Sequence, residues 1–120
     1  GNNIRDWLYV DDHVDALLLV AEKGLPGSKY CIGGNNEKTN LEVVNQICKH
    51  LDKQHPQRYS YKSLIKFVKD RPGHDFRYAI DSSLIKKDLN WAPKHNFEKG
   101  LEKTINWYLR NQNWLRKNIN

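Results

Sequence analysis

The sequence has no hydrophobic run long enough to cross a membrane. A membrane-spanning helix needs about 20 consecutive apolar residues, and no stretch of this 120-residue chain approaches that length. The chain also shows no signal-peptide pattern. We therefore expect a soluble protein with no membrane partner.

Cysteine is scarce, since Cys31 and Cys48 are the two in the sequence. They fall in a predicted apolar strand and on the apolar face of a predicted helix, so we expect reduced core thiols, as in a cytoplasmic protein. No cysteine, histidine or carboxylate pair has metal-ligand spacing, and we expect no metal. His50, His55 and His95 are interpreted as surface residues.

Blocks of one charge are also missing. Lysine and arginine number 20 against 14 aspartate and glutamate, but no five or six like charges follow one another. The excess of positive charge could favour nucleic acid, acidic lipid or phosphorylated small molecules. Because no helix-turn-helix, zinc or aromatic-basic pattern appears, we expect no nucleic-acid partner, and a stand-alone basic binding module stays an alternative.

What is present indicates a globular chain of one domain or part of one. Hydrophobic residues make up 38% and charged residues 28%, and there are four tryptophans and six tyrosines. Residues 4–10, 28–32 and 63–68 are predicted strands. Residues 35–38 are predicted as a polar loop. Helices alternate with the strands, which favours an α/β arrangement.

Four helices are predicted from caps and apolar spacing. Asp11 or Asp12 caps the first, Thr39 and Glu42 form a capping box at the second, Asp81 caps the third, and the fourth covers residues 97–109. The residues expected to face inward are Val14, Leu17, Leu18 and Ala21; then Leu41, Val44, Ile47, Cys48 and Leu51; then Leu84, Ile85 and Leu89; and finally Phe97, Leu101, Ile105, Tyr108 and Leu109.

Three short strands are too few for a doubly wound sheet. Residues 30–32 are apolar enough to need neighbours on both sides. We therefore expect further sequence upstream to complete the fold.

The segment 70–81 gathers the most unusual chemistry. Pro72 and Gly73 are a strong turn signal, because proline fixes φ and glycine accepts φ > 0. Arg71 and Arg77 flank this turn, and two guanidiniums suit a phosphate or carboxylate. The alternative is a solvated surface turn whose charges pair with one another.

Four segments carry a resemblance to a known family. They are residues 4–13 (IRDWLYVDDH), 30–40 (YCIGGNNEKTN), 70–81 (DRPGHDFRYAID) and 89–93 (LNWAP). The chain resembles the C-terminal part of dTDP-glucose 4,6-dehydratases, within the extended short-chain dehydrogenase/reductases. A looser form of the first segment is shared by related epimerases and decarboxylases, so another nucleotide-sugar enzyme of this superfamily is an alternative.

The resemblance implies a fold and a reaction. Residues 1–120 would form the C-terminal nucleotide-sugar-binding domain, with a few short strands and about four helices, and the Rossmann half would be missing. NAD, held by that absent domain, takes hydride from the sugar C4, water leaves across C5 and C6, and hydride returns at C6. The implied substrate is dTDP-glucose, and the full-length enzyme would be a homodimer.

The resemblance also implies a substrate site. Its positions here are Arg5, Asn40, Asp70, Arg71, Pro72, Gly73 and His74. Guanidinium forks and the start of a helix both suit a diphosphate. The alternatives are that Arg5 pairs with a neighbouring aspartate (Asp6, Asp11 or Asp12), that Asn40 is a simple cap, and that His74 is an ordinary turn histidine. His13 is interpreted as a capping or supporting residue.

Two motifs of a complete enzyme of this kind are absent. Gly33 and Gly34 are the one close glycine pair, which is no dinucleotide fingerprint. No tyrosine has lysine four residues later, so the family's Tyr-x-x-x-Lys base is missing. We therefore expect no catalytic and no cofactor-binding residue in this chain and no turnover by it alone. We also expect self-association through uncovered surface, especially along the open edge of the predicted strand at residues 30–32.

Overall fold

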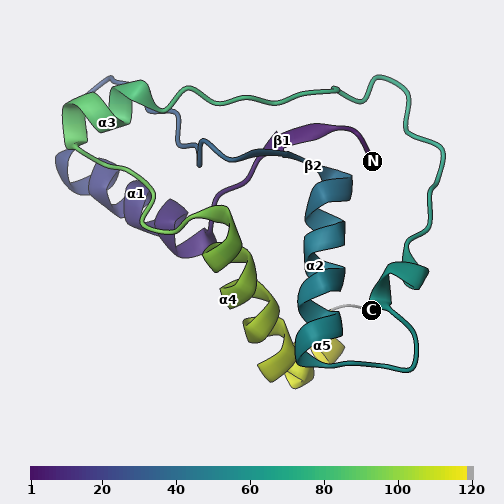
Figure 1. Cartoon of the computed structure of the whole chain (residues 1–120). Helices are drawn as coiled ribbons and strands as arrows, with labels where there is room; N and C mark the ends of the chain where they lie inside the picture. The colour runs from purple at the N-terminus through teal and green to yellow at the C-terminus, as the bar shows by residue number, and fades with distance from the viewer. Residues whose placement is uncertain (119–120) are drawn as a thin grey trace.

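The computed structural model describes residues 1–118. Over these residues it contains two short strands, five α-helices and one 3-10 helix (Figure 1). The elements are β1 (Ile4–Asp6), α1 (Val10–Lys23), β2 (Glu37–Thr39), α2 (Asn40–Gln54), η1 (Tyr61–Leu64), α3 (Ser83–Leu89), α4 (Phe97–Arg110) and α5 (Gln112–Asn118). The predicted mixture of helices and short strands is confirmed, with α5 as one helix more than expected.

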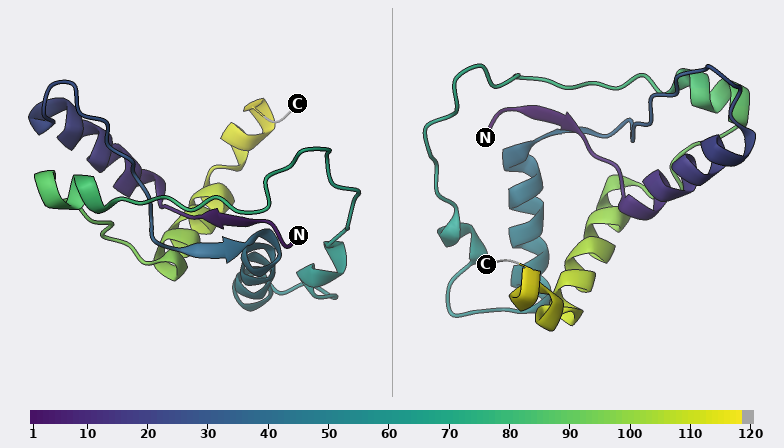
Figure 2. Two further views of the ribbon diagram at one scale, coloured as in Figure 1. Left: turned by 90° about the horizontal axis from the view of Figure 1, so that it is seen from above. Right: turned by 180° about the vertical axis from the view of Figure 1, so that it is seen from behind.

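β1 organises the small sheet. It pairs antiparallel with β2, with Ile4 opposite Thr39. On the other side of β1, the Ile4 N–H donates to the Phe76 carbonyl at 2.7 Å and the Tyr78 N–H donates to the Ile4 carbonyl at 3.0 Å. The long segment between η1 and α3 therefore runs beside β1 (Figure 2, left).

The main core lies between α1 and α3, which run side by side in Figure 1. Ala16 and Ile85 are fully buried and Trp91 nearly so. Burial of a large apolar side chain stabilises a fold by about 1.5–3 kcal/mol, so this cluster joins the two helices. The partly buried side chains around it are Leu8, Leu19, Val20, Tyr30, Ile32 and Leu89.

α2 and α4 form a second contacting pair. The predicted capping box is confirmed: the Thr39 side chain accepts from the Glu42 N–H, and the Glu42 carboxylate accepts from the Thr39 N–H. α2 ends at Gln54 and α4 begins at Phe97, both as predicted. The residues that the two helices bury are Val43, Cys48, Phe97, Gly100 and Ile105.

The molecule is more open than a compact domain of its length. Its radius of gyration is 17.1 Å, whereas a compact 120-residue domain has about 13.6 Å. Its accessible surface is 9358 Å², against about 6,800 Å² for a folded monomer of this mass. α1, α4 and α2 follow one another along an open outline (Figures 1 and 2).

The predicted inward face of α1 is wrong. Val14, Leu17 and Leu18 are 45%, 52% and 57% exposed, and Ala21 is exposed too. α3 packs on the opposite side of α1, where Ala16 is buried. Within residues 1–118 nothing covers the periodic apolar face, so the sequence pattern and the packing disagree there.

Two of the three predicted strands are wrong. Residues 28–32 form no strand, because no ladder partner lies beside them in the described chain. Residues 63–68 instead contain the end of η1 and an irregular segment, in which Phe67 and Val68 are 74% and 87% exposed. The first predicted strand is shorter than expected, since α1 already begins at Val10.

β2 and several caps differ from the sequence prediction. Residues 37–39 lie partly in the expected polar loop, yet they pair with β1. Tyr9, without a side-chain hydrogen bond, is the N-cap of α1 in place of Asp11 or Asp12. Ser82 is the N-cap of α3, although the Asp81 carboxylate accepts from the Ser83 N–H at 2.9 Å.

Some inward positions of the later helices are also corrected. Val43 is buried on α2 while Val44 is 38% exposed. On α3 and α4, Leu84 and Tyr108 are 41% and 43% exposed, whereas Ile85 is fully buried.

The two cysteines differ from each other. Both are free, and Cys48 is buried as expected, but Cys31 is exposed. Cys31 lies in the segment predicted as a buried strand. No partner strand lies beside this segment in the described chain, so Cys31 is exposed. In the part of the chain that the structure describes, no helix is both long and apolar enough to span a bilayer.

Candidate functional site

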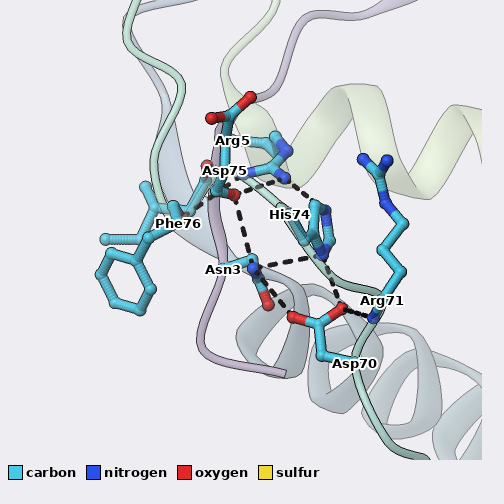
Figure 3. Close-up of polar contacts among 8 residues, drawn as sticks. Asn3, Arg5, Asp70, Arg71, His74, Asp75 and Phe76 are labelled. Atoms are coloured by element: carbon cyan, nitrogen blue, oxygen red, sulfur yellow. Dashed lines mark hydrogen bonds and ion pairs between the residues drawn. The ribbon is translucent and has the colours of Figure 1, made fainter.

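Pairing at β1 brings residues far apart in sequence into one cluster. Arg5 lies on β1, and the segment 70–77 passes beside it (Figure 3). Asn3, just before β1, reaches the same segment. The structure therefore joins Arg5 and the turn that the sequence predicted as separate parts of one site.

The turn has the predicted local structure. Gly73 has φ +68°, a left-handed conformation that glycine adopts without steric cost. One Asp70 oxygen accepts from the Arg71 N–H at 2.8 Å and contacts Nδ1 of His74 at 2.7 Å. The hydrogen bond from His74 lowers the pKa of Asp70 below its ordinary value. Asp70, Pro72, Gly73 and His74 thus act as one compact turn.

Arg5 is held tightly by this turn. Its Nη2 lies 2.7 Å from Nε2 of His74 and 3.0 Å from the Asp75 carbonyl. Its Nη1 lies 2.6 Å from the Ile4 carbonyl, and its guanidinium lies 4.5 Å from the centre of the Tyr78 ring. The alternative that Arg5 pairs with a neighbouring aspartate is wrong, since these contacts occupy its guanidinium.

Arg71 and Arg77 have different surroundings. The Arg77 guanidinium pairs with Glu37 at 2.8 Å, so this part of the turn fits the interpretation of charges that pair with one another. Among residues 1–118 no hydrogen bond holds the Arg71 guanidinium, which extends from the turn beside His74 (Figure 3). Arg71 is therefore the guanidinium available to an anion.

Asn40 lies apart from the turn. Thr39, and not Asn40, is the N-cap of α2, so the simple-cap alternative is wrong. The Asn40 N–H donates to the Asn3 carbonyl at 3.0 Å. Asn3 in turn places its amide 3.5 Å from the Asp70 carboxylate. The start of α2 is thus linked to the turn through Asn3, a residue that sequence reasoning missed.

A second polar cluster joins α1 to α4. Asp12 is 1% exposed, and its carboxylate accepts from the His95 N–H at 3.0 Å and lies 2.9 Å from His95 Nδ1. The other ring nitrogen of His95 is 2.8 Å from Lys103 Nζ. His95 is therefore a packed residue, and its interpretation as a surface residue is wrong.

The remaining histidines complete the comparison. His55 is exposed, as predicted, and His13 is exposed on α1, where its N–H donates to the Tyr9 carbonyl as part of the first helical turn. His50 is half-buried with its Nε2 shielded from solvent, so it also departs from the predicted surface position. The cap residues and the apolar periodicity in the sequence do not indicate how far each of these histidines is buried.

The glycine pair forms no dinucleotide cradle. A Cβ on Gly33 would meet the Asp6 carboxylate and Ile80, and a Cβ on Gly34 would meet the Trp7 carbonyl. The Asp6 carboxylate accepts from the Gly34 N–H at 2.8 Å. The space beside these glycines is filled by the chain itself, so the described residues do not fit NAD at this position.

Comparison with known proteins identifies the family. A family model described as GDP-mannose 4,6 dehydratase matches residues 1–104. The chain belongs to this family. A dTDP-glucose 4,6-dehydratase of Escherichia coli is 51% identical over 121 residues, which cover 98% of this chain and 33% of the relative. The resemblance seen in the four sequence segments is confirmed.

Two solved structures share the fold. The chain superposes on dTDP-glucose 4,6-dehydratase from Bacillus anthracis, in complex with NAD, with a TM-score of 0.83 and 47% identity over 95% of this chain and 34% of that one. DesIV from Streptomyces venezuelae is a dTDP-glucose 4,6-dehydratase with NAD and TYD bound. The chain superposes on it with a TM-score of 0.84 and 36% sequence identity, over 95% of this chain and 33% of that one. The chain spans about a third of the length of these relatives.

Proposed function

We propose that this chain is the nucleotide-sugar-binding part of an NAD-dependent dTDP-glucose 4,6-dehydratase. The observation that carries the proposal is the joining of Arg5 to the Asp70–His74 turn in a chain about half identical to enzymes of that name. The proposed binding positions are those named from the sequence: Arg5, Asn40, Asp70, Arg71, Pro72, Gly73 and His74.

The site chemistry suits a diphosphate. Arg71 offers a planar fork of N–H donors that always carries its charge, and paired donors of this kind match phosphate oxygens. Asn40 stands at the start of α2, where the positive end of the helix dipole favours an anion, while the N–H groups of Asn40 and Glu42 already donate within the chain. We assign no catalytic residue, no NAD-binding residue and no metal ligand to residues 1–120.

The proposed reaction removes water from dTDP-glucose to give dTDP-4-keto-6-deoxyglucose. NAD would be the hydride carrier, held outside the residues described here, and a homodimer and a cytoplasmic location are part of the proposal. The names of the similar proteins favour a dehydratase over an epimerase or decarboxylase, and over a stand-alone basic module.

Binding of nucleotides tests this proposal. The product of the complete reading frame that contains this chain should bind dTDP more tightly than UDP and should not bind a single-stranded oligonucleotide at comparable concentration. Preference for UDP would favour the epimerase or decarboxylase alternative, and preference for the oligonucleotide would favour the basic module. Arg77→Gln is the control for a general loss of positive charge. Because Glu37 already pairs with Arg77, this variant should bind dTDP as the wild type does.

A further inference from the structure

Asp6, the last residue of β1, holds the loop that leads into β2. One oxygen of its carboxylate accepts from the Gly34 N–H at 2.8 Å, and the other accepts from the Asn36 N–H at 2.7 Å. Hydrogen bonds to an ionised carboxylate are stronger than those between neutral groups. Both oxygens of Asp6 are therefore engaged by the backbone of this loop.

The loop between these two amides has a conformation that needs support. Asn35, which lies between them, has φ +52°, in the left-handed region that residues other than glycine rarely adopt. The Asn36 side chain donates a further hydrogen bond to the Gly34 carbonyl at 2.9 Å. Because the N–H groups on both sides of Asn35 point to one carboxylate, Asp6 fixes the path of the chain here.

The glycine pair allows the loop to come this close to β1. A Cβ on Gly33 would meet the Asp6 carboxylate, and a Cβ on Gly34 would meet the Trp7 carbonyl. Side chains at these two positions would therefore push the loop away from its acceptor. The pair is no dinucleotide fingerprint, and its role is the close contact between the loop and the end of β1.

The loop leads through β2 to Asn40, one of the proposed diphosphate positions. β2 is three residues long, and Asn40 is the first residue of α2 (Figure 1). A two-stranded ladder this short is marginally stable by itself. At the loop end of β2, the Trp7 N–H donates to the Asn36 carbonyl and the Trp7 indole N–H donates to the Lys38 carbonyl, both at 3.1 Å. Asp6 and Trp7 therefore fix where β2 starts and, with it, where Asn40 stands.

The side chain of Asn40 is available to a ligand. Within residues 1–118 no hydrogen bond engages its amide group, whereas the Asn40 N–H donates to the Asn3 carbonyl at 3.0 Å. A side-chain amide offers two N–H donors, which suit phosphate oxygens. The place of that amide is set by the backbone that precedes it, and this backbone begins at the loop held by Asp6.

Resting on the proposed diphosphate site, we infer that Asp6 is a positioning residue, which holds the loop 33–36 so that Asn40 stands at the diphosphate and which does not itself contact the ligand. Arg5 and Asp6 are neighbours on β1, and adjacent residues of a strand point to opposite faces. Arg5 then serves the ligand by contact, whereas Asp6 serves it through the loop and β2.

A double-mutant cycle tests this role. The product of the complete reading frame is titrated with dTDP by calorimetry as wild type, Asp6→Ala, Asn40→Ala and the double variant. A lost hydrogen bond to a charged group corresponds to about a tenfold change, so each single variant should weaken dTDP binding by up to about this factor. The double variant should bind no more weakly than Asn40→Ala, because the two residues act through one contact. Equal effects of Asp6→Ala in both backgrounds would overturn the inference.

Two further variants separate positioning from loss of folding. Asp6→Asn keeps one acceptor oxygen and should bind dTDP within about threefold of wild type, given the same relation between hydrogen bonds and affinity. Asp15→Asn removes a carboxylate that pairs with Lys94 on the surface, and it should not change the affinity. Binding by a folded Asp6→Asn protein that is as weak as that of Asp6→Ala would overturn the acceptor role.

Amide exchange gives a readout that does not need the ligand. By NMR, the Gly34 and Asn36 amides should exchange with solvent about tenfold more slowly in the wild type than in Asp6→Ala, as expected for a lost charge-assisted hydrogen bond. The Lys99 amide, which the Asn96 side chain accepts at the start of α4, should exchange equally in both proteins. Equal exchange at Gly34 and Asn36 would overturn the inference even if dTDP binds. Protection that depends on Asp6 in a protein that binds no dTDP would instead overturn the proposed function.

Discussion

At the scale of single residues, Asp12 shows how one buried carboxylate links two parts of the chain. Burial alone would raise the pKa of Asp12, but the hydrogen bonds from the His95 side chain and N–H outweigh it, and the pKa is lowered from 3.8. A buried charge is tolerated when it is paired and hydrogen-bonded. Asp12 therefore fastens α1 to the start of α4.

Removing this carboxylate should be costly. Asp12→Ala would leave the His95 donors without their acceptor, and breaking a buried pair costs about 3–5 kcal/mol. Asp12→Asn keeps an acceptor and should cost less. Urea unfolding of the chain measures both. Asp15→Asn is the matched control, since its partner Lys94 is exposed and such a pair contributes about 0–1 kcal/mol. Equal costs at the two positions would contradict this role.

The same carboxylate makes stability depend on pH. Because the folded-state pKa of Asp12 is lowered, its stabilisation is fully present above the ordinary value of 3.8 and is lost as pH falls through the folded-state pKa. The wild type should therefore lose more unfolding free energy between pH 5 and pH 3 than Asp12→Asn. Parallel curves for the two proteins would show that Asp12 does not contribute.

The sequence was a partial guide to these residues. The Pro72–Gly73 turn and the Arg5 position followed from φ preferences and from the family motif. The contact between Arg5 and His74 did not, because the two residues are 69 positions apart and meet only through the pairing of Ile4 with Phe76 and Tyr78. Asp11 and Asp12 are adjacent and both were predicted as caps, but neither is the N-cap of α1, and only the position of His95 shows that Asp12 is the buried one.

At the scale of elements, the start of α2 depends on its capping box. Thr39→Ala removes the acceptor for the Glu42 N–H and should reduce the free energy of unfolding by about 1 kcal/mol. Thr104→Ala is the control, because the Thr104 hydroxyl donates to the Gly100 carbonyl within α4 and caps nothing. Thermal unfolding of both variants gives the comparison, and an equal effect at Thr104 would argue against the capping box.

Elements with local signals were predictable, and those with distant partners were not. The bounds of α2 and α4 follow from caps and breakers close in sequence. β2 is short and polar, so its pairing with β1 has no signature in residues 37–39. The apolar segment 28–32 had the composition of a strand, but a strand also needs a neighbour, and the described chain supplies none.

At the scale of the whole molecule, the uncovered face of α1 stands out. Val10, Val14, Leu17 and Leu18 recur at helical spacing and are 45–62% exposed, and contiguous apolar surface of this kind favours association. We expect the isolated chain to self-associate through this face.

Charge on this face should suppress that association. Leu17→Lys combined with Leu18→Lys should lower the mass measured by light scattering toward the monomer without loss of folding. Leu64→Lys, at an exposed leucine of η1, should leave the mass unchanged. A wild-type chain that is monomeric at high concentration would contradict the expectation.

The central claim is that this chain supplies the diphosphate site of a dTDP-glucose 4,6-dehydratase. The most direct measurement is the formation of the 4-keto-6-deoxy sugar from dTDP-glucose by the product of the complete reading frame, compared with its Arg71→Gln and Arg77→Gln variants. We predict turnover by the wild type, a KM raised about 10- to 100-fold by Arg71→Gln, as expected for a lost charge-assisted hydrogen bond, and no change for Arg77→Gln. No turnover, or equal KM values for all three proteins, would contradict the account.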